Sequence, residues 1–177
     1  MVKLAPLQPQ HVAHFHAWLR DPEVIEYSLS AFQRMKTTAQ IDQWYAATLQ
    51  DANSLNLGIY LEETNALIGY AGLSGISVTN QSGEYFILIG DKATWGQGVG
   101  TAVTKQIVRL AFTRHQLNRV MLTVSELNTG GLKAYAKAGF VVEGRLRQAA
   151  CRQGVFHDKV VMSVLKAEWE AQGAEGC

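Results

Sequence analysis

The chain has 177 residues, of which 47% are hydrophobic and 18% are charged. A chain of this length buries roughly 70% of the surface that its unfolded form exposes, so it needs no disulfide or structural metal to form a core. Sixteen Lys and Arg balance fifteen Asp and Glu, which argues against DNA or RNA as a partner because nucleic-acid binding requires a basic face.

Neither a membrane span nor a secretion signal is predicted. The longest uncharged stretch, residues 64–83, is interrupted by four glycines, whereas a membrane helix needs about 20 mostly apolar residues. The N-terminus has no continuous apolar region followed by a small-residue cleavage site. Cys151 and Cys177 form no disulfide framework and no zinc-ligand spacing. We therefore expect a cytoplasmic protein with free thiols and no membrane partner.

The first half of the chain begins with helices and continues with strands. A short strand is predicted over residues 2–7, an amphipathic helix over 12–19, and a second helix over about 38–51. Segments rich in Ile, Leu, Val and Tyr then occupy residues 55–61, 67–78 and 84–89, with turn residues between them. Three consecutive strands joined by tight turns predict an antiparallel meander.

The second half alternates strands and helices. A glycine-rich loop leads into an apolar helical stripe that runs from Val99 to about His115, and a strand over residues 119–124 follows. A short helix begins at Asn128, and Gly139 suits the residue just past its end. Two strands, 141–152 and 155–165, form a final hairpin before a polar tail. With no internal repeat and no linker, the sequence predicts one mixed α/β domain over residues 1–177.

The glycine-rich loop is the first candidate for chemistry. Gly96, Gly98 and Gly100 leave consecutive backbone N–H groups unshielded at the start of a helix, which predicts a site for a pyrophosphate. The alternative is that the glycines only permit a tight turn. No Lys-Ser or Lys-Thr pair follows them, so the loop is not a P-loop. The third glycine comes one residue too early for the dinucleotide fingerprint, and the preceding strands look antiparallel.

The helix that begins at Asn128 is the second candidate. Asn128 is a good N-cap, but Gly130 and Gly131 in the first turn cost on the order of 1 kcal/mol each relative to alanine. Close approach of a ligand to this helix end would compensate for that cost. The alternative is a short helix that tolerates the glycines because it is packed. Tyr135, two turns into the helix, either reaches the same opening or is a packing residue.

In ordered combination, these segments resemble the GNAT acetyltransferase superfamily over nearly the whole chain, and in particular its RimJ/RimL-like branch. The resemblance implies an α/β fold with a central mixed, mostly antiparallel sheet flanked by helices. Trp95 departs from the general motif, which begins with Gln or Arg, and Gly131 stands where a Ser or similar small residue is common. The resemblance is carried by residues 4–7 and 18–24, the 95–101 loop, Asn128 with Tyr135, and Gly139-Phe140 with Glu143-Gly144.

The resemblance also implies a ligand and its site. The expected cofactor is acetyl-CoA, with coenzyme A as the product and no metal. The pyrophosphate is expected on the glycine loop, the pantetheine arm along the strand before it, and the Tyr135 hydroxyl near the thioester sulfur. The implied cofactor-binding residues are Leu88, Ile89, Gly90, Trp95, Gly96, Gln97, Gly98, Val99, Gly100, Thr101, Asn128, Gly131 and Lys137.

Amine acetylation needs a polarised thioester carbonyl, an unprotonated amine and a proton for the departing thiolate. A free backbone N–H in the strand before the loop is a candidate donor to the thioester oxygen. Tyr135, with an ordinary pKa near ~10, is the candidate general acid. Glu84 is the candidate base, acting through water, with the alternative that it is only a solvated carboxylate. Glu126, His157 and Asp158 are weaker candidates.

Two other groups of side chains are not expected to carry chemistry. Only two of His11, His14 and His16 share a helix face, and no acidic residue lies at matching spacing, so we expect surface histidines and not a metal site. Cys151 lies in no motif that lowers a thiol pKa, which favours direct transfer over a covalent acyl-cysteine.

The sequence therefore predicts an acetyl-CoA-dependent N-acetyltransferase that moves an acetyl group directly to a primary amine. The acceptor is either a protein N-terminal amine, as the RimJ/RimL resemblance implies, or a small-molecule amine such as a polyamine; an amino-sugar nucleotide is a third class. Asp21, Glu23 and Glu26 steer a cationic acceptor unless they only begin a helix. A non-catalytic acyl-CoA-binding domain is the alternative from a different class of protein, and formation of a homodimer is left open.

Overall fold

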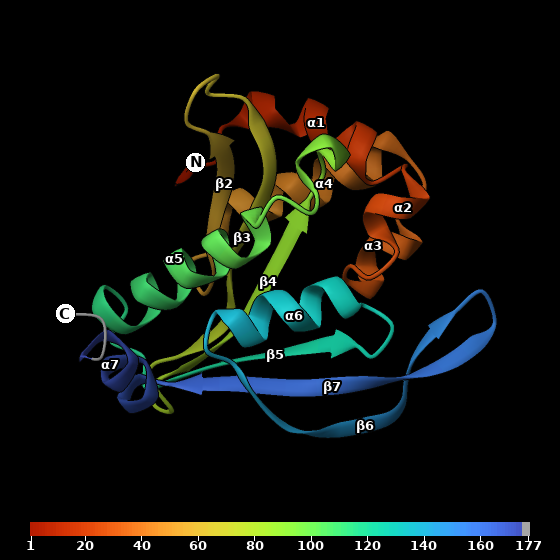
Figure 1. Ribbon diagram of the computed structural model, residues 1–177. Coiled ribbons are helices and arrows are strands. Elements are labelled where there is room, and N and C mark those ends of the chain that lie inside the picture. Colours follow the sequence, from red (N-terminus) through yellow and green to blue (C-terminus); the bar gives the residue numbers. More distant parts are fainter. Residues whose placement is uncertain (175–177) are drawn as a thin grey trace.

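The computed structural model describes residues 1–174, and Figure 1 gives the arrangement of its elements. In chain order they are β1 (Val2–Pro6), the 3-10 helix η1 (Pro9–His11), α1 (Val12–Trp18), α2 (Pro22–Ile25), α3 (Ser30–Arg34), α4 (Thr38–Gln50), β2 (Leu55–Leu61), β3 (Leu67–Ser77), β4 (Ser82–Ile89), the 3-10 helix η2 (Lys92–Thr94), α5 (Val99–Thr113), β5 (Arg119–Ser125), α6 (Thr129–Lys137), β6 (Val141–Arg152), β7 (Val155–Leu165) and α7 (Lys166–Ala174).

The seven described strands form one sheet in the order β1-β2-β3-β4-β5-β7-β6. Neighbours are antiparallel except β4 and β5, which are parallel. The parallel pair is possible because α5 crosses over between the two strands, whereas a tight turn joins only antiparallel neighbours. The ladder between them covers only Ser82, Gly83 and Glu84 on β4, and beyond it the two strands diverge (Figure 1).

Helix α5 covers one face of the sheet. Val103, Ile107 and Ala111 are fully buried, because residues four apart share one side of a helix. They pack with sheet residues such as Tyr85 and Val120 in one hydrophobic cluster. The glycine loop is therefore tied to the sheet by the helix that follows it.

Helices α1 and α4 form a second hydrophobic cluster with the other face. Phe15, Ile41 and Tyr45 are buried there together with Leu88 of β4. Helix α4 begins with a capping box, in which Thr37 accepts from the Gln40 backbone N–H at 3.2 Å and the Gln40 side chain accepts from the Thr37 N–H at 3.1 Å. Alternate residues of β4 thus contribute to both clusters.

Most of the predicted elements are confirmed, and three short helices were not predicted. The predicted strands 55–61, 141–152 and 155–165 have the bounds of β2, β6 and β7. Helices α2 and α3 were not predicted, because four or five residues are too few to display a helical period. No helix was predicted for the polar tail after residue 165. It begins with α7, whose Trp169 ring lies 5.6 Å from the ring of Phe112.

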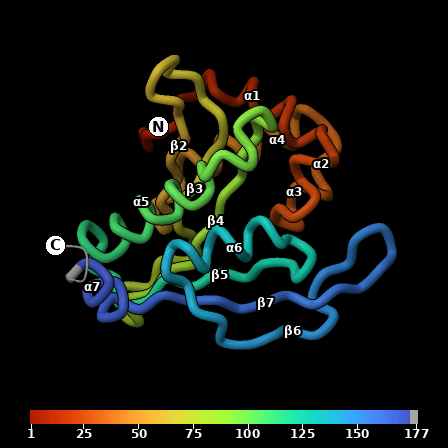
Figure 2. Tube along the Cα trace, in the orientation of Figure 1, coloured from red at the N-terminus to blue at the C-terminus, as the bar shows by residue number. Residues whose placement is uncertain are grey.

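The β6–β7 hairpin extends beyond the end of β5 (Figure 2). Its turn is formed by Gln153 and Gly154, which have φ values of +51° and +79°. Two consecutive residues with positive φ are typical of a tight two-residue hairpin turn. The predicted turn at residues 152–154 is therefore confirmed.

No helix within residues 1–174 is long and apolar enough to cross a membrane. The cytoplasmic location stays a prediction. Cys151 is an exposed free thiol, and Cys177 lies outside the described residues.

Candidate active site

The divergence of β4 from β5 leaves part of the β4 backbone without a neighbouring strand. The Gly90 N–H donates to the carbonyl of Ile68 on β3 at 2.8 Å. Successive residues of a strand direct their backbone groups to opposite edges, so the N–H and C=O of Ile89 face the gap. The indole Nε1 of Trp95 donates to the Ile89 carbonyl oxygen at 3.0 Å. The Ile89 N–H therefore remains available as a donor at the open edge.

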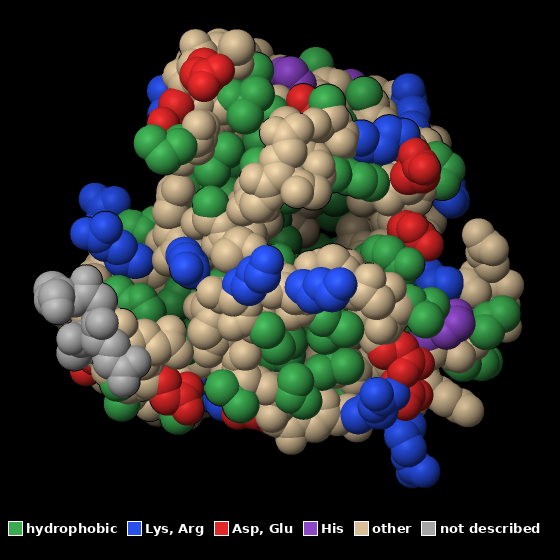
Figure 3. Space-filling view, in the orientation of Figure 1, with side chains coloured by type: hydrophobic (Ala, Val, Ile, Leu, Met, Phe, Trp, Pro, Cys, Tyr) green, Lys and Arg blue, Asp and Glu red, His purple; other side chains and the backbone are tan. Residues whose placement is uncertain are grey.

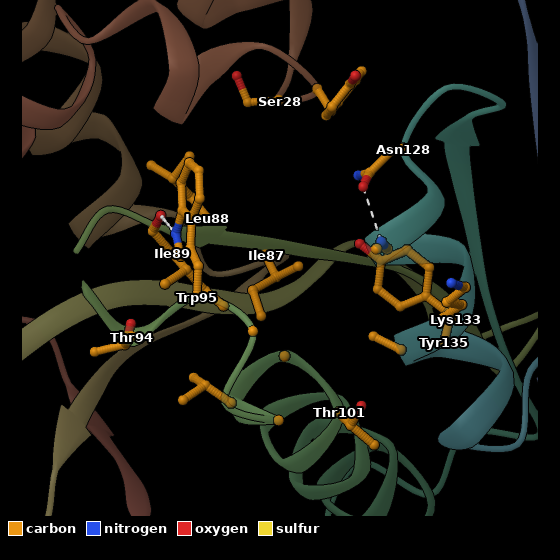
Figure 4. Close-up of a pocket in the computed structure, with 18 of the residues that line it drawn as sticks. Ser28, Ile87, Leu88, Ile89, Thr94, Trp95, Thr101, Asn128, Lys133 and Tyr135 are labelled. Carbon is orange, nitrogen blue, oxygen red and sulfur yellow. Dashed lines mark hydrogen bonds between the residues drawn. The ribbon is translucent and has the colours of Figure 1, made fainter. Parts of the chain in front are cut away.

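A pocket of about 490 Å³ occupies this gap. The surface is hollowed above α6, and Lys and Arg side chains lie in a row along the near side of the hollow (Figure 3). Segments from four parts of the chain enclose the pocket, and Figure 4 shows the side chains that they contribute. The lining residues are Glu23, Val24, Glu26, Tyr27, Ser28, Ile87, Leu88, Ile89, Thr94, Trp95, Gly96, Gly98, Val99, Gly100, Thr101, Asn128, Gly130, Gly131, Lys133, Ala134, Tyr135 and Lys137.

The glycine loop forms the floor of the pocket at the start of α5. Gly96 and Gly98 have φ values of +75° and +81°, a conformation that other residues adopt only with strain. A Cβ built on either residue meets no atom within 4 Å. The loop therefore needs glycine for its backbone angles, and the space above it is open for a ligand to approach the backbone N–H groups.

Helix α6 supplies the opposite wall. The Asn128 side chain accepts from the Gly131 N–H at 2.9 Å and caps the helix. A Cβ at Gly131 would lie 2.7 Å from Nδ2 of Asn128, so a larger residue would displace the capping side chain. The absence of a side chain at Gly131 thus leaves room for the Asn128 side chain that caps the helix. Lys133 and Lys137, both exposed on this helix, line the pocket and give this wall a positive charge.

Tyr135 extends from α6 toward β4 (Figure 4). Its ring lies edge-on to the ring of Tyr85 at 5.9 Å and 6.2 Å from the ring of Phe140. Burial raises the pKa of Tyr135 to about 12, because a phenolate is poorly solvated there. The hydroxyl is consequently protonated throughout the neutral pH range.

Tyr85 connects Tyr135 to the glycine loop. Its hydroxyl lies 2.9 Å from Oγ1 of Thr104, and that oxygen donates to the carbonyl of Gly100 at 2.6 Å. Tyr85 and Thr104 are both buried. The residues that hold the ring of Tyr135 and the first turn of α5 therefore belong to one packed unit.

The structure brings all but three of the predicted site residues into the pocket lining. Glu84 is exposed and lies at the last pair of the β4–β5 ladder. Gly90 is buried under Trp18, where a Cβ would lie 2.0 Å from the indole Cδ2. The Gln97 side chain donates to the Ala93 carbonyl at 2.7 Å. The functional roles of all the predicted site residues, inside and outside the lining, stay predictions.

The wall formed by residues 23–28 was not predicted as a unit. From the sequence, the acidic residues of this segment either steer an acceptor or begin a helix, and no motif links them to a loop about seventy positions later. The structure brings Glu23, Glu26, Tyr27 and Ser28 to the pocket. Lys92 Nζ lies 2.5 Å from Glu23 Oε2 and 2.7 Å from Asp21 Oδ2. Lys92 is thus shared by Glu23 and Asp21, whereas no ion pair engages Glu26 within residues 1–174.

Glu126, a weaker candidate for the base, and His16, which was not expected to bind a metal, are both engaged by neighbouring groups. Arg145 Nη1 lies 2.5 Å from Glu126 Oε2, and the Asp158 N–H donates to the same carboxylate at 3.1 Å. His16 Nε2 lies 2.6 Å from Asp42. In the part of the chain that the structure describes, no group of three or more His, Cys, Asp or Glu side chains is arranged to hold a metal ion.

Comparison with known proteins identifies the family. The family model for the acetyltransferase (GNAT) domain matches residues 2–141. The putative ribosomal N-acetyltransferase YdaF of Bacillus subtilis is 30% identical over 122 residues, which are 69% of this chain and 65% of that protein. The chain thus spans just under two thirds of that relative.

Relatives that the match covers more fully are also N-acetyltransferases. The spermidine N(1)-acetyltransferase of Escherichia coli K12 is 22% identical over 171 residues, which are 97% of this chain and 89% of that protein. The crystal structure of a Vibrio cholerae spermidine N-acetyltransferase in complex with CoA and spermine has a TM-score of 0.86 and 20% identity, and the match covers 96% of this chain and 98% of that one. These likenesses bear out the predicted fold class, and with the family match they lead to one conclusion: the chain belongs to the GNAT acetyltransferase family.

Proposed function

We propose that the protein transfers an acetyl group from acetyl-CoA to a primary amine by direct transfer. The observation that carries the proposal is the open edge of β4, which leads from the glycine loop to the hydroxyl of Tyr135 within one pocket. A thioester lying along this edge would meet a backbone donor, an anion-binding loop and a protonated phenol. Each of these groups serves a step that acetyl transfer requires.

The residues present fit coenzyme A. At Gly96 and Gly98 a built Cβ meets no atom within 4 Å, so the backbone of the loop is open on that side. The loop precedes a fifteen-residue helix whose N-terminus favours an anion. Lys133 and Lys137 add positive charge on the facing wall. The pantetheine arm would lie along β4 at Ile89. When bound, acetyl-CoA supplies the acetyl group as an activated thioester.

Two groups of the chain act on the reacting atoms in this proposal. The Ile89 N–H donates to the thioester oxygen as negative charge develops there. The Tyr135 Oη–H donates a proton toward the departing sulfur. With a pKa of about 12, the phenol is a weaker acid than a thiol with its ordinary pKa of ~8.5. Partial proton transfer, or rapid reprotonation from water, therefore fits Tyr135 better than complete transfer.

The acceptor amine must lose a proton before it attacks. We keep Glu84 as the proposed base, acting through water. Its exposed carboxylate lies on β4 just before the strand leaves β5, so water can reach it. Glu126 is a poorer candidate because Arg145 and the Asp158 N–H already bind its two oxygens.

The charge of the pocket favours a cationic acceptor. The α6 wall carries Lys133 and Lys137, whereas the opposite wall carries Glu23 and Glu26. Because Lys92 pairs with Glu23, Glu26 is the carboxylate left to attract an ammonium group. We therefore propose a small polyamine-like amine as the preferred acceptor, which the likeness to spermidine acetyltransferases supports. A protein N-terminal amine, supported by the likeness to YdaF, is the second candidate.

One experiment tests the activity and its acceptor class. Thiol release from acetyl-CoA is measured with spermidine, an N-terminal peptide and an amino-sugar nucleotide at equal concentrations. We expect the fastest release with spermidine. Faster release with the peptide would assign a protein acceptor. Binding of acetyl-CoA without amine-dependent thiol release from any of the three would favour the acyl-CoA-binding alternative and contradict the proposal.

A further inference from the structure

Two segments that are far apart in sequence meet at one side of the pocket. One is the link between α2 and α3, from which Glu26, Tyr27 and Ser28 line the pocket. The other is the tip of the β6–β7 hairpin, which ends in Arg152 before its turn. Arg152 lies 126 positions after Glu26 in the chain but contacts it directly.

Arg152 binds the α2–α3 link through its guanidinium group. Nε donates to the Glu26 carbonyl at 3.0 Å, Nη2 donates to the Ser28 carbonyl at 3.2 Å, and Nη1 donates to the Cys151 carbonyl at 3.1 Å. Within residues 1–174 no other hydrogen bond reaches the Glu26 or Ser28 carbonyl. A planar guanidinium suits this task because its donors have a fixed spacing.

The two carbonyls flank Tyr27. Fixing the groups on both sides of one residue restricts the backbone angles of that residue, and hence the direction of its side chain. Tyr27 is 38% exposed, so packing alone does not hold it. Ser28 is anchored on its other side by hydrogen bonds from its N–H and hydroxyl to the Ile25 carbonyl, at 3.1 and 2.8 Å.

From these contacts we infer that Arg152 is a positioning residue for acceptor recognition: it fastens the hairpin tip to the α2–α3 link and so holds Tyr27 and Glu26 at the entrance of the pocket. The inference rests on the proposed function, since it assigns this entrance to the amine. The hydrogen bonds of the Arg152 side chain reach the α2–α3 link and Cys151, and within residues 1–174 none reaches the glycine loop. Its loss should consequently affect binding of the amine and leave binding of acetyl-CoA unchanged.

The test compares Arg152→Ala and Arg152→Lys with Arg147→Ala, a control that removes an exposed arginine from the same strand. With spermidine as the acceptor, we expect Arg152→Ala to raise the KM for the amine about tenfold, with kcat and the KM for acetyl-CoA within about twofold of wild type. The KM of Arg152→Lys for the amine should be intermediate, because an ammonium group cannot reproduce the fixed spacing of the guanidinium donors. Arg147→Ala should match wild type.

A second readout does not depend on activity. Hydrogen exchange of residues 26–29 should be faster in Arg152→Ala than in wild type and unchanged in Arg147→Ala. Unchanged exchange in Arg152→Ala, an unchanged KM for the amine, or an equal rise in the KM for acetyl-CoA would overturn the inference. If Arg152→Lys has the wild-type KM for the amine and wild-type hydrogen exchange, the positive charge alone explains the role of Arg152, and the proposed hydrogen-bonding role is wrong. A wild-type protein that acetylates no amine would instead refute the proposed function, while the exchange measurement still decides the role of Arg152.

Discussion

Replacing Tyr135 by phenylalanine removes one hydroxyl and leaves the ring packed against Tyr85 and Phe140. We expect kcat to fall on the order of 10²-fold, in the range of a positioned general acid, while the melting temperature and the KM for acetyl-CoA stay near wild type. Steady-state kinetics and thermal unfolding check this result. Tyr60→Phe is a suitable control, because it removes the hydroxyl of a tyrosine that does not line the pocket.

The pH dependence separates the possible roles of Tyr135. With a pKa of about 12, its hydroxyl stays protonated across the range in which the enzyme is assayed. The kcat–pH profiles of wild type and Tyr135→Phe should therefore have the same shape and differ only in height. A loss of wild-type activity near pH ~10, absent from the variant, would mean that Tyr135 titrates at its ordinary pKa. Full kcat in the variant, with chemistry limiting turnover, would leave Tyr135 as a packing residue.

The glycine loop is an element whose role can be tested by one pair of variants. Gly98→Asp would place a carboxylate at the proposed pyrophosphate site, and we expect the Kd for acetyl-CoA to rise at least ~10-fold through like-charge repulsion. Gly98→Asn is the matched control, because asparagine has the same shape and tolerates positive φ equally well. Calorimetric titration of both variants distinguishes charge from backbone strain. Equal affinities in the two variants would contradict an anion site at this loop.

The strands on the other side of the gap carry an acid-sensitive contact. Glu143 on β6 accepts from Arg119 on β5 at 2.6 and 2.5 Å and from the Ser163 hydroxyl on β7 at 2.7 Å. The Arg119 guanidinium, and then the Ser163 hydroxyl, lower the pKa of Glu143 from 4.5 to about 2. A depressed carboxyl pKa contributes stability above pH 4.5 that is lost as the pH falls toward 2.

Glu143→Gln removes this titration. We expect the variant to melt below wild type at neutral pH and the difference to shrink as the pH is lowered from 4.5 toward 2. Thermal unfolding at a series of pH values measures it. A difference that stays constant over the whole series would show that the carboxylate charge contributes nothing to stability.

At the scale of the whole molecule, ligand binding should change the stability of the fold. Acetyl-CoA should raise the melting temperature, whereas NAD and ATP at the same concentration should not, because only a pantetheine-bearing ligand uses both the glycine loop and the open edge of β4. Differential scanning fluorimetry with the three ligands checks this expectation. Equal stabilisation by NAD would instead favour a dinucleotide site.

The sequence predicted those parts of the fold whose signals are local. Periodicity located the long helices and strands, and the glycines of residues 96–100 predicted a loop that faces a pocket. The sequence suggested Glu26 for steering a cationic acceptor, but it did not predict the contact of this segment with Arg152, because the two meet only in the folded chain. Helix α7 was missed because its single large apolar residue, Trp169, has no helical period of its own. The pairing of Lys92 with Glu23 likewise joins segments 69 residues apart.

The short ladder between β4 and β5 has a mechanical consequence for the molecule. Three residue pairs connect the two halves of the sheet there, compared with seven between β5 and β7. A sheet is stiff where its ladder is long, so we expect twisting of one half against the other to concentrate at this junction. A ligand that contacts both β4 and β5 would connect the two strands beyond their ladder and reduce that twisting. We therefore expect the geometry that opens the gap also to make this junction the most easily deformed part of the sheet.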